Sequence, residues 1–207
     1  YPAKYVAIQG DPNSKAISIV FGDTTFSLMI MALYPTNDDK TGDQIQTAIR
    51  SIYYDKNFKI DPFATAAFTL DESKSQFKFS KFSSGIYVYS LGGVDKESFN
   101  NEPFVTISTL PIDHTFTAKG LSEMLISSLE QYGLTDKDVQ HTSSNDVNGY
   151  PACESVIAGK INGMKSQIYQ LIILGEDKAI AIQGIVKTDF ENTLREIKKL
   201  AKTITLK

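Results

Sequence analysis

The sequence predicts an α+β protein in which an antiparallel β-sheet carries three main helices packed on its faces, an α-β-α sandwich. Runs of alternating apolar and polar residues recur along the chain, as in half-buried strands. In three other stretches apolar residues recur at intervals of three and four, the period of an amphipathic helix. These helical stretches are interspersed among the strands, an order that favours helices packed on a sheet.

The first part of the chain predicts strands at residues 6–8, 16–21 and 25–33, with a tight turn at Gly22-Asp23. The third strand is apolar at every second position, with Leu28 and Ile30 on one face. The alternate positions, Met29 and Met31 among them, are apolar as well. This pattern predicts a strand whose two faces are both covered.

The first helix is predicted to begin at Thr41, because Gln44 three residues later would complete a capping box. Its apolar stripe is Ile45, Ala48, Ile49, Ile52 and Tyr53. The second helix is predicted over residues 117–132 and should end at Gly133, which tolerates the left-handed conformation of a C′ position. The third is predicted to be capped by Thr188, with Glu191 three residues on. Its stripe is Phe190, Leu194, Ile197, Leu200 and Ala201.

The remaining strands are predicted at residues 64–70, 76–82, 85–91, 104–110, 152–161, 164–174 and 178–186. The stretch GKINGMKSQIY, residues 159–169, has apolar-alternating runs on either side of Asn162-Gly163. That pair favours positive φ at both central residues of a type I′ turn. The stretch is therefore interpreted as a β-hairpin within a meander that leads into the last helix.

Length and composition fit one soluble globular domain over residues 1–207. Hydrophobic residues make up 42% of the chain and charged residues 22%. The longest apolar runs are far shorter than the roughly 20 residues of a membrane-spanning helix. A net charge of −3 and scattered basic residues argue against nucleic acid as a partner.

The last third of the chain, residues 148–207, carries an ordered set of turn and packing residues. Asn148-Gly149-Tyr150-Pro151 precedes a strand, Asn162-Gly163 joins two strands, and Gly175-Glu176-Asp177-Lys178 precedes a third. That strand ends at Gln183-Gly184, and a helix and a closing KTITL follow. This order resembles the PsbP-like fold of the photosystem II extrinsic protein, a nuclear Ran-binding protein, and bacterial secreted and lipoprotein domains.

The resemblance implies a domain that is not an enzyme and that binds other proteins, in some members metal ions. Turn and packing residues carry it, so it concerns the fold, and no functional residue is transferred to a position of this chain. Among the members of this fold, the chain is most similar in kind to uncharacterised proteins of the bacterial cell envelope. A photosynthetic role is not implied.

The chain begins with Tyr1 rather than Met, which predicts that a leader was removed from the N-terminus. An acylated export anchor would leave such a mature chain, and we expect an extracytoplasmic protein in the periplasm or at the cell surface. The single cysteine, Cys153, excludes an internal disulfide. No transmembrane segment is predicted.

His114, His141 and Cys153 are the residues with catalytic chemistry to consider. Asp113-His114 sets a carboxylate beside an imidazole in a loop, but adjacent side chains rarely face each other, so a solvated histidine is favoured. His141 is likewise interpreted as a solvated histidine, here in a predicted edge strand. Cys153 is interpreted as a buried structural thiol, because a nucleophile needs a nearby base.

Asp38, Asp39 and Asp43 could offer oxygens to a hard cation, yet their spacing does not fit an EF-hand, and acidic residues suit a helix N-terminus. Residues 145–149 are interpreted as an Asx-rich turn. No metal site, cofactor or catalytic residue is therefore predicted.

Three further sequence patterns were considered, and none of them predicts a functional site. Aromatic residues alternate with lysines over residues 77–82, where a half-buried strand is favoured over a base-stacking surface. Ser83-Ser84-Gly85 is a turn and not a nucleophile elbow. The sequence also lacks the glycine-rich loops of nucleotide-binding folds.

The function predicted from the sequence is a non-enzymatic, exported interaction domain that binds an unidentified protein. The loops at residues 34–40 and 94–102 are the expected points of contact. The alternative is a small-ligand or metal-binding protein, or an enzyme, with a site assembled from residues far apart in the sequence. These hypotheses differ in whether His114, His141, Cys153 or the acidic loops meet in a cleft.

Overall fold

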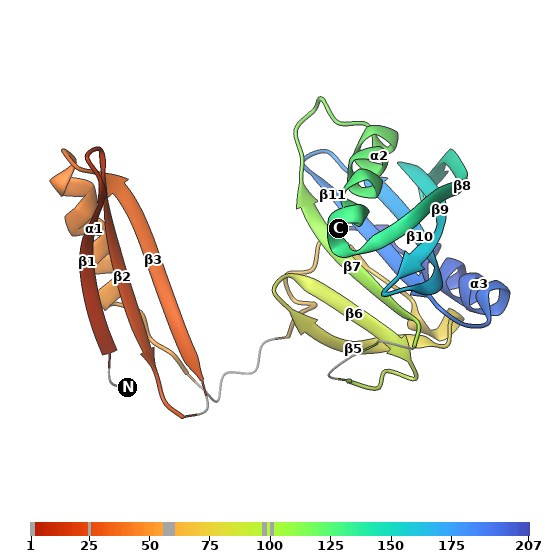
Figure 1. Ribbon diagram of the computed structural model, residues 1–207, viewed down its shortest axis with the longest axis horizontal. Coiled ribbons are helices and arrows are strands. Elements are labelled where there is room, and N and C mark those ends of the chain that lie inside the picture. The colour runs from red at the N-terminus through yellow and green to blue at the C-terminus, as the bar shows by residue number, and fades with distance from the viewer. Residues whose placement is uncertain (1–2, 25, 56–60, 97–98, 100–101) are drawn as a thin grey trace. The chain divides into compact units, whose positions relative to one another are not determined.

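The chain is an α+β protein with mostly antiparallel sheets, seen here in a computed structural model that describes residues 3–24, 26–55, 61–96, 99 and 102–207. Contacts within the chain group it into two compact units, Tyr1–Ile60 and Asp61–Lys207 (Figure 1). We call these the N-terminal unit and the C-terminal unit. One domain over residues 1–207 stays the prediction from the sequence.

The N-terminal unit is a three-stranded antiparallel sheet with one helix. Its strands lie in the order β1 (Ala3–Asp11), β2 (Ser14–Gly22) and β3 (Ser27–Pro35), and α1 (Asp39–Arg50) contacts β2 and β3. Thr25, where the third strand is predicted to start, lies outside the described residues. Helix α1 covers one face of this sheet, whereas Met29, Met31 and Leu33 on the other face are exposed. Within the chain, therefore, only one of the two faces of β3 that were predicted to be covered is covered.

Helix α1 begins earlier than the capping-box pattern predicts. Asp38 is the N-cap, and its carboxylate accepts the backbone N–H of Thr41 at 3.0 Å. The helix ends at Arg50, so the predicted stripe is cut short: Ile49 is buried, whereas Tyr53 beyond the end is 84% exposed.

The C-terminal unit is built on a seven-stranded antiparallel sheet in the order β5-β6-β7-β11-β10-β9-β8. The strands are β5 (Phe77–Ser83), β6 (Ile86–Leu91), β7 (Phe104–Pro111), β8 (Leu134–Val147), β9 (Tyr150–Ile161), β10 (Met164–Leu174) and β11 (Lys178–Val186). The helices are α2 (Ala118–Ser128) and α3 (Phe190–Ala201), with short 3₁₀ turns at Glu72–Lys74 and Leu129–Tyr132.

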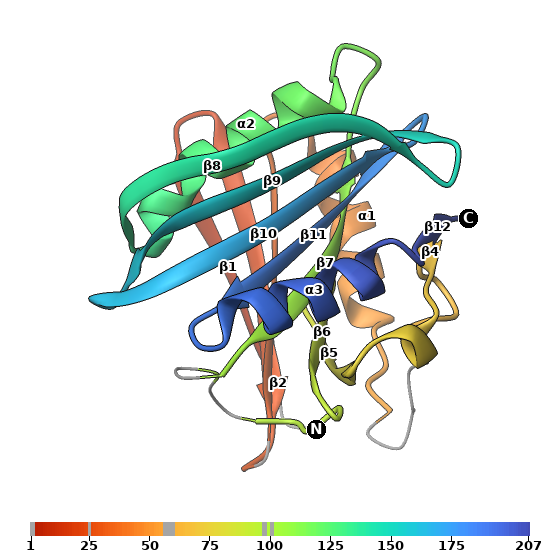
Figure 2. The ribbon, with the colours of Figure 1, turned by 90° about the vertical axis from the view of Figure 1, so that its right-hand side faces the viewer.

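Helices α2 and α3 pack on different faces of this sheet (Figure 2). Leu121 of α2 clusters with Ile172, whereas Ile197 of α3 clusters with Leu171 and Ile173. Consecutive residues of a strand point to opposite faces, so the two helices are separated by the sheet. The structure thus differs from the prediction of three helices on one sheet, because α1 belongs to the N-terminal unit.

Several local predictions are confirmed, and others are corrected. The hairpin of β9 and β10 turns at Asn162 and Gly163, with φ of 52° and 77°. Thr117 caps α2, and Gly133 takes a φ of 88° after the following 3₁₀ turn. The N-cap of α3 is Asp189 and not Thr188.

The predicted strand at residues 64–70 is reduced to β4 (Phe68–Thr69), which pairs with β12 (Thr205–Leu206) near the end of the chain. None of the described helices has the length and apolarity that crossing a bilayer requires.

Candidate functional site

The residues with predicted catalytic chemistry lie in different surroundings. His114 and His141 are exposed, the first in the loop before α2 and the second on the edge strand β8. Cys153 is fully buried in β9. In the described part of the chain, no three His, Cys, Asp or Glu side chains gather in a way that could hold a metal ion.

The acidic residues before α1 take part in local structure. Asp38 accepts hydrogen bonds from the hydroxyl of Thr41 at 2.6 Å and from its backbone N–H, and these bonds lower the pKa of Asp38. Asp39 pairs with Lys15 at 2.9 Å. Both carboxylates therefore serve the start of the helix and its link to β2.

The Asx-rich turn after β8 is also structural. Asn148 takes a φ of 51° and Gly149 a φ of 86°, values that fit the turn between β8 and β9. The side-chain amide of Asn148 donates to the backbone oxygens of Lys202 and Ile204. The turn is thereby fastened to the segment that follows α3.

Two of the three aromatic residues of β5, Phe77 and Phe79, pack inward, whereas Phe82 is exposed. Phe77 is buried, and the ring of Phe79 lies 4.8 Å from that of Phe63 and 5.9 Å from that of Tyr89. Lys81 pairs with Asp95 at 2.9 Å. The half-buried strand predicted for residues 77–82 is confirmed.

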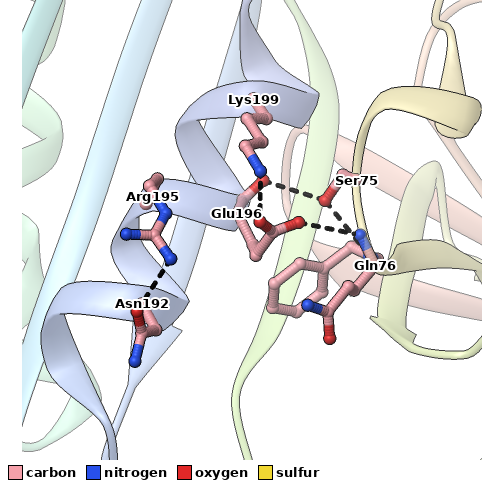
Figure 3. Close-up of polar contacts among 7 residues, drawn as sticks. Ser75, Gln76, Asn192, Arg195, Glu196 and Lys199 are labelled. Atoms are coloured by element: carbon pink, nitrogen blue, oxygen red, sulfur yellow. Dashed lines mark hydrogen bonds and ion pairs between the residues drawn. The ribbon is translucent and has the colours of Figure 1, made fainter.

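Two nearly buried carboxylates that the sequence analysis did not single out hold α3 in place. Glu196 accepts the backbone N–H of Gln76 at 3.1 Å and pairs with Lys199 at 2.6 Å, while the hydroxyl of Ser75 donates to the Glu196 backbone oxygen (Figure 3). The pair with Lys199 and the bond from Gln76 lower the pKa of Glu196. The i, i+3 spacing of Glu196 and Lys199 was the signal in the sequence.

The second of these carboxylates is Glu154 of β9. It pairs with Lys198 of α3 at 2.7 Å and accepts a hydrogen bond from the hydroxyl of Tyr169 at 3.3 Å. Burial raises the pKa of Tyr169, as does the neighbouring charge of Glu154. Two lysines of α3 are thus paired with carboxylates, Lys198 with one on the sheet and Lys199 with one on the same helix.

A chain of polar side chains runs across the sheet beneath α2. Gln183 donates to Gln170 at 2.9 Å, and Gln170 donates to the hydroxyl of Ser122 at 2.8 Å. Ser122 and Ser155 lie 3.3 Å apart, and Ser155 lies 3.2 Å from Thr142. Ser122, Ser155 and Gln170 are buried, so the chain satisfies polar groups that would otherwise be costly inside the protein.

The hairpin of residues 159–169 borders a shallow cavity of about 310 Å³. Ala158, Gly159 and Phe190 contribute to its walls, and Lys160 and Lys165 lie at the same site. Lys160 pairs with Asp136 at 2.7 Å. The stretch is thus a hairpin, as predicted, and it also lines a pocket with mainly apolar walls.

The feature that stands out in the N-terminal unit is the sheet face opposite α1, which we call the open face. Register places three rows of side chains across it: Lys4–Val20–Met29, Val6–Ser18–Met31 and Ile8–Ala16–Leu33. Six large apolar side chains are exposed there, from 38% for Val20 to 67% for Leu33. Lys4 is the one charged residue within these rows.

Comparison with known proteins finds likeness in fold alone. No family model and no curated protein matches the sequence. The apo immunity protein TplEi of T6SS from Pseudomonas aeruginosa is similar over 98% of this chain and 72% of its own, with 9% identity and a TM-score of 0.50.

Two other similar structures have lower TM-scores. Cyanobacterial PsbP (CyanoP) from Synechocystis sp. PCC 6803 is similar over 75% of this chain and 99% of its own, with 10% identity and a TM-score of 0.44. A Bacteroides thetaiotaomicron protein is similar over 68% of this chain, with 11% identity and a TM-score of 0.45, and the match spans 45% of that protein's length.

Proposed function

We propose that this protein is a non-enzymatic interaction domain that binds another protein through the open face of its N-terminal unit. The observation that carries the proposal is the exposure of six large apolar side chains on one face of one small sheet. Contiguous apolar patches of this kind are uncommon on monomeric proteins and mark interaction sites.

The apolar character and low charge of the open face indicate which class of partner it can bind. Its three rows hold a single charge, at Lys4, so the face offers little attraction to the phosphates of nucleic acid. Burial of apolar surface is the main driving force that it can supply. A protein surface of matching apolar character is the partner that gains from such a contact.

The sequence supports the same partner class independently. Met29, Met31 and Leu33 alternate with Leu28, Ile30 and Ala32, a pattern typical of a strand buried on both faces. Within the unit α1 covers one of these faces. A partner protein on the open face would complete the burial that the pattern implies.

The predicted contact loops contribute less to this proposal. In the loop at residues 34–40, Asp38 and Asp39 are occupied in capping α1 and in the pair with Lys15. In the loop at residues 94–102, positions 97, 98, 100 and 101 lie outside the described residues. The open face therefore takes the role that the sequence analysis gave to these loops.

A photo-crosslinking experiment in the source cells tests this function. A photoreactive amino acid replaces Met31 on the open face or Met124 on α2, which is exposed to a similar degree, 51% against 57%. We expect an adduct with one defined protein from position 31 and not from position 124. That protein, once purified, should bind the wild-type chain and lose affinity for a Met31→Glu variant. Absence of a position-specific adduct would contradict the proposal.

We further propose an extracytoplasmic location and, for the C-terminal unit, a PsbP-like α-β-α sandwich. The packing of α2 and α3 on different faces of the large sheet supports the sandwich. The similarity to TplEi concerns the fold and transfers no partner to this chain. Fractionation of cells that produce the protein from its natural gene tests the location, which a purely cytosolic signal would contradict.

The second candidate function is small-ligand binding at the cavity beside the β9–β10 hairpin. Its volume of about 310 Å³ falls at the lower end of the range for ligand pockets, and it combines apolar walls with lysines. A thermal-shift panel of metals, nucleotides, sugars and carboxylic acids tests it. A ligand at a hundred times its Kd adds about 2.7 kcal/mol of stability, so a flat panel would count against this function.

A further inference from the structure

The edges of the sheets differ in how well they are protected against pairing with another strand. The two larger sheets of the described chain have four edge strands, β1, β3, β5 and β8. Strands β1, β5 and β8 each contain a break in register and carry lysines, Lys4, Lys78 and Lys137 among them. Bulges and lysines are devices by which natural proteins keep an edge strand from pairing. Three of these four edges are therefore protected.

Strand β3 lacks both devices. It pairs with β2 over nine consecutive residues without a register shift, and its sequence SLMIMALYP contains no charged residue. Its only proline, Pro35, is the last residue of the strand. A long, regular and apolar edge of this kind is open to pairing with a further strand.

The backbone of β3 directs three residues toward this open edge. In continuation of the β2–β3 register, the N–H of Thr36 donates to the backbone oxygen of Asn13 at 2.9 Å. Hydrogen-bonded and non-hydrogen-bonded pairs alternate in an antiparallel ladder, so the even-numbered residues of β3 bond to β2. The N–H and C=O groups of Met29, Met31 and Leu33 therefore point away from β2, and β3 has no second neighbour among the described strands.

The side chains of β3 are incompletely covered on both faces of the strand. On the open face the exposed fraction runs from 57% for Met31 to 67% for Leu33. On the opposite face Leu28 and Ile30 are only half-buried, although α1 packs on that face. A strand beside β3 would cover both sets, because opposite side chains on adjacent strands lie about 5 Å apart.

Helix α1 adds to this uncovered apolar surface. The helix runs along the strands (Figure 1), and its buried residue Ile49 faces the sheet. On one side of Ile49, Gln46 donates to the hydroxyl of Tyr5 in β1 at 2.8 Å. Ile45, which is half-buried, and Ala48, which is exposed, lie on the other side of the helix. The flank of α1 that is turned away from β1, toward the β3 edge, is thus apolar and incompletely covered.

A second copy of the chain is a less suitable occupant of this edge than a different protein. Pairing β3 of one copy with β3 of another would place two open faces side by side in one continuous sheet. Most of the exposed apolar surface of both faces would stay exposed, since an added strand covers only its immediate neighbours. A different protein that contributes one strand can bring the rest of its surface over the open face.

We propose, on the basis of the proposed protein-binding function, that the partner adds an extended strand to the sheet of the N-terminal unit, antiparallel to β3. In β-strand addition, main-chain hydrogen bonds supply affinity and alternate side chains supply specificity. The added strand pairs with the outward backbone groups of Met29, Met31 and Leu33. Its side chains extend the open face on one side and pack beside Leu28, Ile30 and the flank of α1 on the other. The segment is therefore apolar at both sets of alternate positions, over about five to seven residues.

Backbone-methylated peptides test the inference on the full chain. Both labelled probes carry the same central run of about seven valine, isoleucine and leucine residues, with lysines at the ends for solubility. In the first peptide alternate amide nitrogens are methylated, which leaves one edge free to pair. In the second every amide nitrogen of the run is methylated, which blocks both edges. We expect the first to bind in fluorescence anisotropy and the second to bind at least roughly tenfold more weakly.

Substitutions at Met31 locate the site. Met31→Pro removes an outward N–H without removing a bond to β2, so it should weaken binding of the first peptide by roughly tenfold or more. Met31→Val is the matched control, because it also shortens the side chain but keeps the N–H, and it should change binding by less than roughly threefold. Thermal unfolding shows whether each variant is folded. Leu33→Pro, at the next outward position, repeats the test if Met31→Pro does not fold.

Amide hydrogen exchange followed by NMR reads out the backbone directly. In the free chain the amide protons of Met29, Met31 and Leu33 should exchange faster than those of Leu28 and Ile30, which are bonded to β2. The first peptide should slow exchange at the three outward positions by roughly tenfold or more. A peptide bound through side chains alone would leave the alternation of fast and slow amides unchanged.

The outcomes separate this inference from the proposed function. Equal binding of the two peptides, or equal effects of Met31→Pro and Met31→Val, would overturn strand addition and leave protein binding at the open face intact. A concentration-dependent dimer that Met31→Pro dissociates would identify a second copy as the occupant and overturn the inference. Absence of binding by both peptides would overturn it as well, while the position-31 crosslink in the source cells independently decides the proposed function.

Discussion

Tyr87 and Tyr89 lie on the same face of β6 but differ in whether their hydroxyl groups form a hydrogen bond. The hydroxyl of Tyr87 donates to the backbone oxygen of Pro62 at 2.6 Å. That of Tyr89 is buried and has no hydrogen-bond partner among the described residues. Burial raises the pKa of both phenols, so both stay protonated at neutral pH. The pair offers a comparison between a satisfied and an unsatisfied buried hydroxyl.

We predict that Tyr89→Phe raises the free energy of unfolding by about 1 kcal/mol, because it removes a polar group whose burial is uncompensated. Tyr87→Phe should lower it by about 1 kcal/mol, because it removes a hydrogen bond. Urea unfolding of both variants measures the two signs. A destabilised Tyr89→Phe variant would mean that the hydroxyl has a partner, such as an ordered water.

Glu196 gives a prediction for the dependence of stability on pH. Its pKa is lowered in the folded protein by Lys199 and by the N–H of Gln76. A carboxyl group with a lowered folded-state pKa contributes stability above its unfolded pKa, and that contribution is lost as pH falls through the folded value. Glu196→Gln should therefore cost about 1 kcal/mol at neutral pH and progressively less in acid.

Urea unfolding across the acidic range, with Glu191→Gln as the exposed control on the same helix, measures this difference. The control should follow the wild-type profile. If Glu196→Gln and the wild type differed by a constant amount at every pH, the ionised carboxylate would not be the source of the stability.

At the scale of the elements, local signals predicted structure best where one or two residues determine the backbone. Asn162-Gly163 fixed the hairpin of β9 and β10, and Thr117 and Gly133 bounded the second helix with its 3₁₀ turn. The start of α1 was misplaced because Asp38 outcompetes Thr41 as the N-cap. Both types of residue can cap, and which one does so depends on where the preceding strand ends.

Features that depend on distant segments were not predictable from local pattern. The two-residue strands β4 and β12 pair residues 68–69 with residues 205–206, and neither has a periodicity of its own. The open face shows the same limit at a candidate site. Its apolar residues were visible in the sequence, but only the structure shows that α1 covers the opposite face and leaves these residues exposed.

Gly184 of β11 gives the prediction for packing between elements. A Cβ at this position would lie 2.7 Å from Cδ1 and 2.8 Å from Cγ2 of Ile197, so α3 rests directly on the glycine. Gly184→Ala should lower the free energy of unfolding by about 1–3 kcal/mol through overpacking. Ile197→Val removes one of the two clashing atoms and should partly offset this cost.

A double-mutant cycle measures that compensation by chemical denaturation. The double variant should be less destabilised than the sum of the two single variants by about 1 kcal/mol. Additive effects would show that the backbone of β11, rather than the side chain of Ile197, absorbs the added methyl group.

At the scale of the whole molecule, the two units differ in how much core they contain. The three hydrophobic clusters of the described chain all consist of residues between 63 and 206. In the N-terminal unit the buried apolar side chains among the described residues are Ile17 and Ile49. Small domains with little buried surface are only marginally stable.

We therefore predict that residues 61–207 fold as an isolated fragment, with a cooperative thermal transition, and that residues 1–60 alone do not. Circular dichroism and differential scanning calorimetry of the two fragments check this. A sharp transition in the fragment of residues 1–60 would contradict the expectation, and loss of cooperativity in the larger fragment would mean that its core needs the N-terminal unit.

The buried thiol of Cys153 has a practical consequence for watching this molecule open. It lies in β9, inside the seven-stranded sheet, and is the only cysteine in the sequence. Its register partner Ile172 clusters with Leu121 of α2, so Cys153 lies on the face of the sheet that α2 covers. An alkylating reagent can therefore reach the sulfur only when α2 or a neighbouring strand moves away, and each labelled molecule records one such opening. The rate of Cys153 alkylation, followed by mass spectrometry, thus measures how often the C-terminal unit opens, and no residue has to be introduced for labelling.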